Sequence, residues 1–166
     1  MYKIINTGGT FNKRYDPVKG ELFVPADDMA VEEALKPIGI GCEIAVKGVL
    51  YKDSLEMDDA DRELLCDEVC SAGETGIVVV HGTDTMHKSA AAIDARLGED
   101  GGKRVVLTGA MVPFSIDPVE AVANLSSAVT ALNFLEPGVY ISMHGVVLPY
   151  RNIVKNRRLG IFERVE

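Results

Sequence analysis

The sequence contains no tryptophan, and only 6% of its 166 residues are aromatic. Basic residues are scarce, with 17 lysines and arginines against 25 acidic residues and a net charge of −8. We therefore expect no nucleic-acid partner, because a nucleic-acid site needs a basic surface. No apolar run approaches the roughly 20 residues needed to cross a bilayer, so no membrane-spanning segment is predicted.

Cysteine is also rare, with three residues, Cys42, Cys66 and Cys70. An odd number without framework spacing indicates a reducing compartment rather than disulfides. Cys66 and Cys70 lie four apart on a predicted helix, which would suit two metal ligands, but the favoured interpretation is small apolar residues on a buried face. The first residues run into a predicted strand without a signal-peptide pattern, which indicates a cytoplasmic protein. A mature secreted form is the alternative.

What the sequence does contain is an alternation of short apolar runs with amphipathic segments, which is typical of βαβ units and a parallel sheet. The length suits one domain with a sizeable core. Strands are predicted at residues 2–6, 43–50, 77–81, 104–108 and 139–143. Helices are predicted at residues 27–36, 58–72, 85–96 and 118–135, with Asp58 or Asp59 capping the second and Asp117 capping the fourth. The predicted fold is a single α/β domain with a doubly wound, mostly parallel sheet, flavodoxin-like and three-layered.

Two of the predicted strands end in threonine-containing loops. The first leads into Thr7-Gly8-Gly9-Thr10, and the third leads into His81-Gly82-Thr83-Asp84-Thr85-Met86. Because loops at the carboxyl ends of neighbouring parallel strands meet in one crevice, Thr10, Thr83 and Asp84 are expected to share a site. Two hydroxyls and a carboxylate in one cleft favour nucleophilic catalysis.

These two loops resemble the signature motifs of the bacterial-type L-asparaginase/glutaminase family. Residues 104–113, which end in Gly109-Ala110-Met111-Val112-Pro113, and the segment Tyr150-Arg151-Asn152-Ile153-Val154-Lys155 are similar to further segments of that family. The resemblance covers nearly all of residues 1–166 but only the larger, N-terminal domain of a usual member. The second family domain is expected to be absent, with Glu166 near the start of the linker to it.

The resemblance implies that Thr10 is a nucleophile that attacks a side-chain amide carbon. A threonine hydroxyl needs a base, and two routes to one remain open. One is Tyr15, in the loop after Thr10, and the other is a buried set of Thr83, Lys155 and Asp84. Read without the resemblance, Lys155 would be a solvated lysine beside Arg157.

The resemblance also implies which residues bind the substrate. Asp84 would hold the α-ammonium group and Ser54 the α-carboxylate, although Ser54 could instead cap the following helix. The remaining substrate-binding residues would be Gly9, Gly82 and Glu56. Leu55 and Glu56 depart from the polar contacts that many members carry here, and Leu55 cannot donate a hydrogen bond.

The segment 11–25 is polar and breaks the strand–helix pattern. Its ends, residues 11–15 and 21–24, are predicted to pair as a hairpin around a turn at residues 17–20. Its place after the expected nucleophile favours a lid, with an ordinary surface hairpin as the alternative.

The sequence therefore predicts an asparaginase-like enzyme that hydrolyses a small carboxamide through a threonine acyl-enzyme, with no metal and no organic cofactor. The alternatives are a non-catalytic module that binds a small molecule, and a subunit that needs a partner domain for activity. A homodimer is expected, with the helix at residues 118–135 contributing to its interface.

Overall fold

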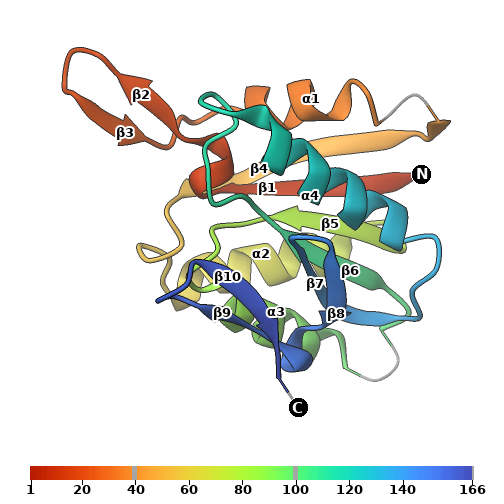
Figure 1. The fold of residues 1–166 in the computed structure, drawn as a ribbon. Helices are drawn as coiled ribbons and strands as arrows, with labels where there is room; N and C mark the ends of the chain where they lie inside the picture. The colour runs from red at the N-terminus through yellow and green to blue at the C-terminus, as the bar shows by residue number, and fades with distance from the viewer. Residues whose placement is uncertain (39–40, 99–100, 166) are drawn as a thin grey trace.

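The computed structural model describes residues 1–38, 41–98 and 101–165. Its centre is a six-stranded sheet, in which the first five strands are parallel and the last is antiparallel to its neighbour (Figure 1). In spatial order the strands are β4 (Ile44–Lys52), β1 (Tyr2–Gly8), β5 (Gly76–Val80), β6 (Arg104–Thr108), β7 (Gly138–Met143) and β8 (Val146–Pro149). The chain thus winds outward in both directions from β1 and β5, as a doubly wound sheet does.

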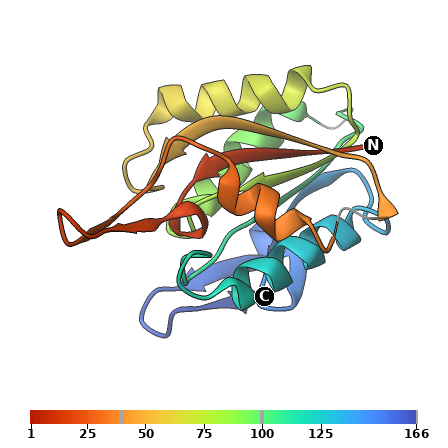
Figure 2. The ribbon, with the colours of Figure 1, turned by 90° about the horizontal axis from the view of Figure 1, so that it is seen from above.

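The central strands are buried on both faces, which explains their continuous apolar sequences. All five residues of β5 are buried, and so are the last five of β1. Two helices cover each face. Helices α1 (Met29–Leu35) and α4 (Pro118–Ala131) pack together on one face, and α2 (Asp59–Ser71) and α3 (Met86–Leu97) pack together on the other (Figure 2). The result is the three-layer α/β domain that the sequence predicts.

Capping side chains set where two of these helices begin. The Asp58 carboxylate accepts a hydrogen bond from the Asp61 N–H, and the Asp61 carboxylate accepts one from the Asp58 N–H, so Asp58 is the cap of α2. The Asp117 carboxylate accepts from the Val119 N–H ahead of α4, with Pro118 in the first turn. Helix α4 ends at Ala131, before the predicted end at residue 135. In the residues that follow, the N–H groups of Asn133 and Phe134 donate to carbonyls three residues earlier, which is the tighter 3-10 pattern.

Two small hairpins project on the side where the parallel strands end (Figures 1 and 2). The first joins β2 (Arg14–Asp16) to β3 (Glu21–Phe23) and follows a short 3-10 turn, η1 (Thr10–Asn12). The second joins β9 (Ile153–Asn156) to β10 (Ile161–Arg164) and follows the 3-10 turn η3 (Tyr150–Asn152). The hairpin expected within residues 11–25 is therefore present, with a shorter first strand because Phe11 and Asn12 are buried in η1.

All five predicted strands and all four predicted helices are present, with boundaries that differ by a few residues. Strands β8, β9 and β10 are additional. They are short and partly exposed, so their sequences carry no long apolar run, and β8 follows a tight turn in which His144 has a positive φ of 51°. Among the described residues, no helix is long and apolar enough to cross a membrane.

Candidate active site

The loops after β1, β4 and β5 meet at the carboxyl edge of the sheet. A side-chain Cβ on Gly9 would lie 2.5 Å from the Cα and N of Gly82, and one on Gly82 would lie 2.6 Å from the Cβ of Ser54. Glycine is required at both positions because the backbones approach this closely, and Gly9 also has a positive φ of 71°. The structure thus brings together the three loops that carry Thr10, Ser54 and Thr83.

Thr10 begins η1, directly after Gly9, and is partly exposed. Two buried asparagines, Asn6 and Asn12, stabilise the turn that carries Thr10. Their side-chain amides donate hydrogen bonds to each other, each 2.9 Å long. Asn12 also donates to the Gly8 carbonyl at 2.8 Å, and Asn6 to the Asp28 carboxylate at 2.8 Å. The buried amides therefore fix the backbone on which Thr10 is mounted.

Lys155 joins Thr83 and Asp84. Its ammonium nitrogen Nζ donates to Thr83 Oγ1 at 2.7 Å and to Asp84 Oδ1 at 2.9 Å. The Lys155 side chain is only 11% exposed, so the alternative of a solvated lysine is wrong. Strand β9 positions this side chain, and the Thr83 hydroxyl in turn donates to the sulfur of Met111 at 3.5 Å.

Asp84 has a second cationic neighbour, Arg157, in the turn of the same hairpin. The Arg157 Nε lies 3.5 Å from Asp84 Oδ1, and its Nη2 donates to the Asp84 carbonyl at 3.3 Å. The carboxylate therefore ties the hairpin of β9 and β10 to the loop after β5.

Ser54 is buried, and its backbone and hydroxyl link the loop after β4 to the start of α3. Its Oγ accepts from the Thr85 N–H at 3.3 Å, and its carbonyl accepts from the Thr85 hydroxyl at 2.7 Å. The alternative that Ser54 caps α2 is wrong, because Asp58 fills that position.

The other residues proposed from the sequence lie further out. Leu55 is 62% exposed beside Ser54, and Glu56 lines a shallow pocket with Lys13 and Tyr51. Tyr15 is 59% exposed on β2, and its hydroxyl lies beside Gly20 in the hairpin turn. The described part of the chain provides no hydrogen-bond partner for that hydroxyl, so the structure does not bring Tyr15 into the set formed by Lys155.

His81 is a buried residue at the start of the loop after β5, and no role for it is predicted from the sequence. Its Nδ1–H donates to the Gly82 carbonyl at 2.7 Å, which leaves Nε2 to accept from the Ser89 hydroxyl at 2.8 Å. Complete burial lowers the pKa of His81 to about 4, so the ring is neutral near pH 7. The sequence signal for a buried histidine is its position directly after an apolar strand and before a glycine.

Asp53 was also missed, and it connects the first hairpin to the site. Its carboxylate pairs with Lys13 at 2.6 Å. Burial alone would raise the pKa of Asp53, but hydrogen bonds from Lys13 and the Leu55 N–H, and the nearby charges of Lys13 and Lys155, lower it below its usual value. No pattern in the sequence pairs residues 40 positions apart.

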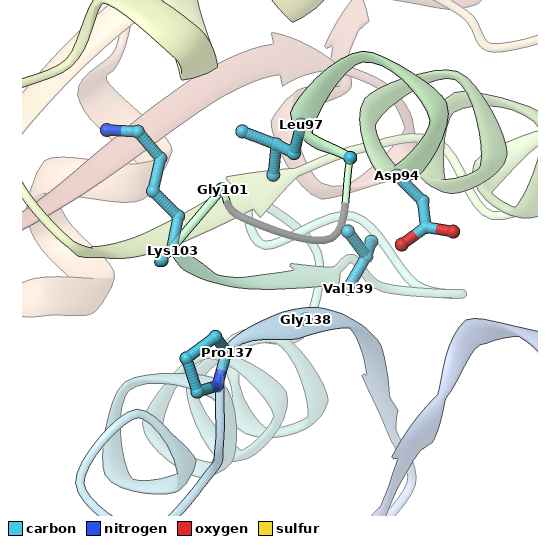
Figure 3. Close-up of a pocket in the computed structure, with 9 residues that line it drawn as sticks. Asp94, Leu97, Gly101, Lys103, Pro137, Gly138 and Val139 are labelled. Atoms are coloured by element: carbon cyan, nitrogen blue, oxygen red, sulfur yellow. The ribbon is translucent and has the colours of Figure 1, made fainter.

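A cleft of about 500 Å³ opens beside the set of Thr83, Asp84 and Lys155. The residues that line it are Ser54, Leu55, Met57, Arg62, Asp84, Thr85, His87, Lys88, Val154, Lys155 and Arg157. A smaller cavity of about 160 Å³, lined by Asp94, Lys103 and Val139 among others, lies at the opposite edge of the sheet, where β6 and β7 begin (Figure 3). Within the described ranges, no group of three or more His, Cys, Asp or Glu side chains is arranged to hold a metal ion.

The sequence matches the family model described as "Asparaginase, N-terminal" over residues 2–162. This match spans nearly the whole chain, and the chain therefore belongs to the asparaginase family. A glutamyl-tRNA(Gln) amidotransferase subunit of Methanococcus maripaludis (strain C7) is 33% identical over 146 residues, which cover 86% of this chain and 34% of that protein. The L-asparaginase of Thermococcus kodakarensis is 27% identical over 164 residues, which cover 95% of this chain and 48% of that protein.

Solved structures agree on the fold. The thermostable L-asparaginase from Thermococcus kodakarensis superposes with a TM-score of 0.82 at 24% identity, over 99% of this chain and 51% of that one. A structure described as a probable cytoplasmic L-asparaginase from Campylobacter jejuni gives 0.76 at 26% identity, over 94% and 49%. The chain thus spans from about a third to about half of the length of these relatives.

Proposed function

We propose that this domain hydrolyses a small, asparagine-like carboxamide to the acid and ammonia through an ester on Thr10. The observation that carries the proposal is the position of Lys155 Nζ between Thr83 Oγ1 and Asp84 Oδ1. Thr83 and Asp84 belong to the loop after β5, which contacts the loop that carries Thr10. A buried lysine between a hydroxyl and a carboxylate is a set suited to moving protons.

In the proposed reaction, Thr10 Oγ attacks the amide carbon, and the hydroxyl proton passes to a base. The amide C–N bond breaks as the nitrogen takes up a proton and leaves as ammonia, and water then hydrolyses the Thr10 ester to the acid. The structure favours Thr83 and Lys155 over Tyr15 for the proton transfers, because the exposed Tyr15 side chain directs its hydroxyl to Gly20 in the hairpin turn. Backbone N–H groups near Gly9 and Gly82, with Thr83, would stabilise the oxyanion.

Substrate contacts follow the same geometry. Asp84 would accept the substrate ammonium, and Ser54 would meet its carboxylate. Glu56 is a less direct candidate, since it lines a different pocket. The reaction needs no metal or organic cofactor, and we place the protein in the cytoplasm, as the description of the Campylobacter jejuni neighbour does for that protein.

A second candidate is a subunit that works only with a partner. The relative from Methanococcus maripaludis is named as one subunit of an amidotransferase, and this chain covers only 34% of it. The exposed Leu55, where a polar contact would hold the substrate, agrees with a pocket that another polypeptide completes. The third alternative, a non-catalytic binding module, would keep the pocket without the reaction.

The test is ammonia release by the purified chain and by its Thr10→Ala variant. We expect Thr10→Ala to lower the rate of ammonia release by several orders of magnitude. Its circular dichroism spectrum should be unchanged, because the fold is kept. Thr130→Ala, on the exposed face of α4, is the matched control and should retain full activity. Activity that survives Thr10→Ala removes Thr10 from the mechanism, and a wild-type chain that is inactive alone favours the partner-dependent alternative.

A further inference from the structure

The cleft beside Asp84 is cationic, although the whole chain carries a net charge of −8. Among the described residues that line it, four side chains are permanently or usually cationic and one is a carboxylate. The cations are Arg62, Lys88, Lys155 and Arg157, and the carboxylate is Asp84. Lys155 already pairs with Asp84, so the cleft holds positive charge in excess of what its own carboxylate neutralises.

Arg62 is held rigidly in this cleft. Its Nη1 donates to the carbonyls of Met57 and Asp58 at 3.0 Å, and its Nη2 donates to the Thr85 hydroxyl at 3.3 Å. Its nearest carboxylate, Asp59, lies 3.8 Å away and is fully exposed, so it neutralises little of the charge. Its Nε is buried and has no hydrogen-bond partner in the part of the chain that the structure describes.

The first turn of α3 adds positive potential from the backbone. The hydroxyl of Thr85, the N-cap residue, donates a hydrogen bond to the Ser54 carbonyl and does not cap the helix. The first turn contains no acidic residue. The positive end of the α3 dipole therefore lies at the cleft, where Thr85, His87 and Lys88 form part of the lining. No acidic side chain in the first turn of α3 offsets it. Within the described residues, Lys88 makes no ion pair.

We propose that this cationic cleft, formed by Arg62, His87, Lys88 and Arg157, binds a carboxylate or phosphate group that the substrate carries in addition to its amino-acid carboxylate. The inference rests on the proposed function, and it names the substrate class as an anionic amide larger than free asparagine. Three positive side chains and a helix N-terminus around one cleft suit an oxyanion, which accepts several charge-assisted hydrogen bonds. Leu55, which is 62% exposed, lines the same cleft.

His87 provides a built-in reporter of the cleft. It lines the cleft together with Lys88, Arg157 and Arg62, and its pKa is lowered first by burial and then by the charges of these three cations. Asp84 is the carboxylate on the same lining. A bound anion would offset the three cations, so the His87 pKa should rise when the cleft is filled.

The experiment is a titration of the intact chain with inorganic phosphate and, separately, with glutarate, followed by calorimetry and by the His87 ring signals in NMR spectra recorded over pH. We expect binding at millimolar concentrations of at least one probe and an upward shift of the His87 pKa on binding. The probe that binds more tightly distinguishes a phosphate-bearing from a carboxylate-bearing substrate.

Charge-removing variants locate the site. Lys88→Gln and Arg157→Gln should each weaken binding about tenfold, whereas Arg158→Gln, an exposed neighbour that does not line the cleft, should change it less than about twofold. No binding of either probe, or equal weakening by all three variants, overturns the proposal. Since the titration needs no turnover, a chain that binds the anions but releases no ammonia refutes only the proposed function. A chain that releases ammonia and ignores the anions refutes only this inference.

Discussion

At the scale of single residues, the proposed chemistry depends most directly on Lys155. Replacing it in Lys155→Met removes both hydrogen bonds to Thr83 and Asp84 while keeping an apolar stem of similar length. We expect ammonia release to fall about a hundredfold or more, as for the loss of a general base. The measurement is kcat/KM of the purified variant, with Lys19→Met at the exposed hairpin turn as the control. Turnover close to wild type would transfer the role of base to Tyr15 or to water.

His81 makes stability depend on pH. Its pKa is about 4 in the folded protein, against 6.5 as the ordinary value, so the unfolded chain binds the proton more readily. The contribution to stability is therefore complete above pH 6.5 and is lost as the pH falls toward 4. That difference corresponds to on the order of 3 kcal/mol. Denaturant unfolding of wild type and His81→Asn between pH 7 and about 4 measures it.

The variant should show a flatter dependence on pH than the wild type. His87, whose pKa is also lowered by burial, acts in the same direction in both proteins, so only the difference between them reports on His81. Carboxylates such as Asp61 and Glu68 have lowered pKa values, so their stabilisation is lost mainly below the His81 window. Equal slopes for the two proteins would show that His81 is not buried in the neutral form.

Which site residues the sequence could predict follows from how they are encoded. Thr10, Thr83 and Asp84 come directly after apolar strands, so the topology of a parallel sheet brings their loops together. Lys155 has no such pattern and was found through the resemblance alone. Met111 and Asp53 reach the site through contacts between distant loops, which a one-dimensional pattern does not contain.

At the scale of elements, the first hairpin has a base that is packed on the domain and an exposed turn, whose hydrogen bonds are local ones to Asp16. Phe11 stacks on Phe114 with ring centroids 6.3 Å apart, the Phe114 N–H donates to the Phe11 carbonyl, and the Ser115 hydroxyl donates to the Lys13 carbonyl at 2.8 Å. If the hairpin acts as a lid, it moves beyond this base. Amide hydrogen exchange of the free protein should be slow at Asn12 and fast at residues 16–20.

The stacked rings should control that difference. Phe114→Ala removes the ring that covers Phe11, so exchange at Asn12 and Lys13 should become faster, while Phe134→Ala, at an exposed phenylalanine, should leave it unchanged. Uniformly slow exchange through residues 16–20 would count against a lid. Exchange that is equally slow in Phe114→Ala would show that the base is held by the remaining hydrogen bonds.

The main elements were predictable because each carries a strong signal, and the added strands were not. The buried strands β5 and β6 are continuous apolar runs, and α4 has a helical spacing of apolar residues with Asp117 and Pro118 at its start. Strands β9 and β10 have exposed or half-buried positions at most of their residues, so neither a continuous run nor a strict alternation is present. They form because the two strands pair with each other. As a consequence, Lys155 on β9 lies against Thr83.

At the scale of the whole molecule, the expected homodimer depends on which apolar surface is exposed. Helix α4 buries Ala121, Leu125, Ala128 and Val129, and its strongly exposed Val119 (72%) lies far from Phe134 (82%), which follows the end of the helix. Both hairpins carry exposed apolar side chains on the side where the parallel strands end, namely Val18, Leu22, Phe23, Val154, Leu159 and Ile161. We therefore expect self-association to use the side of the candidate active site rather than α4.

Light scattering at micromolar concentrations tests this expectation. The wild type should show a mass of twice 17.9 kDa, because a two-fold dimer is the commonest way to cover such a surface. A double variant on the hairpins, Val18→Lys with Leu159→Lys, should shift the mass toward the monomer, since two charges would have to be buried at the interface. The control in the segment 118–135, Val119→Lys with Phe134→Lys, should remain a dimer. A dimer that dissociates only in the α4 variant would return the interface to that helix, and a wild type of 17.9 kDa at every concentration would show that the domain is stable with this side exposed.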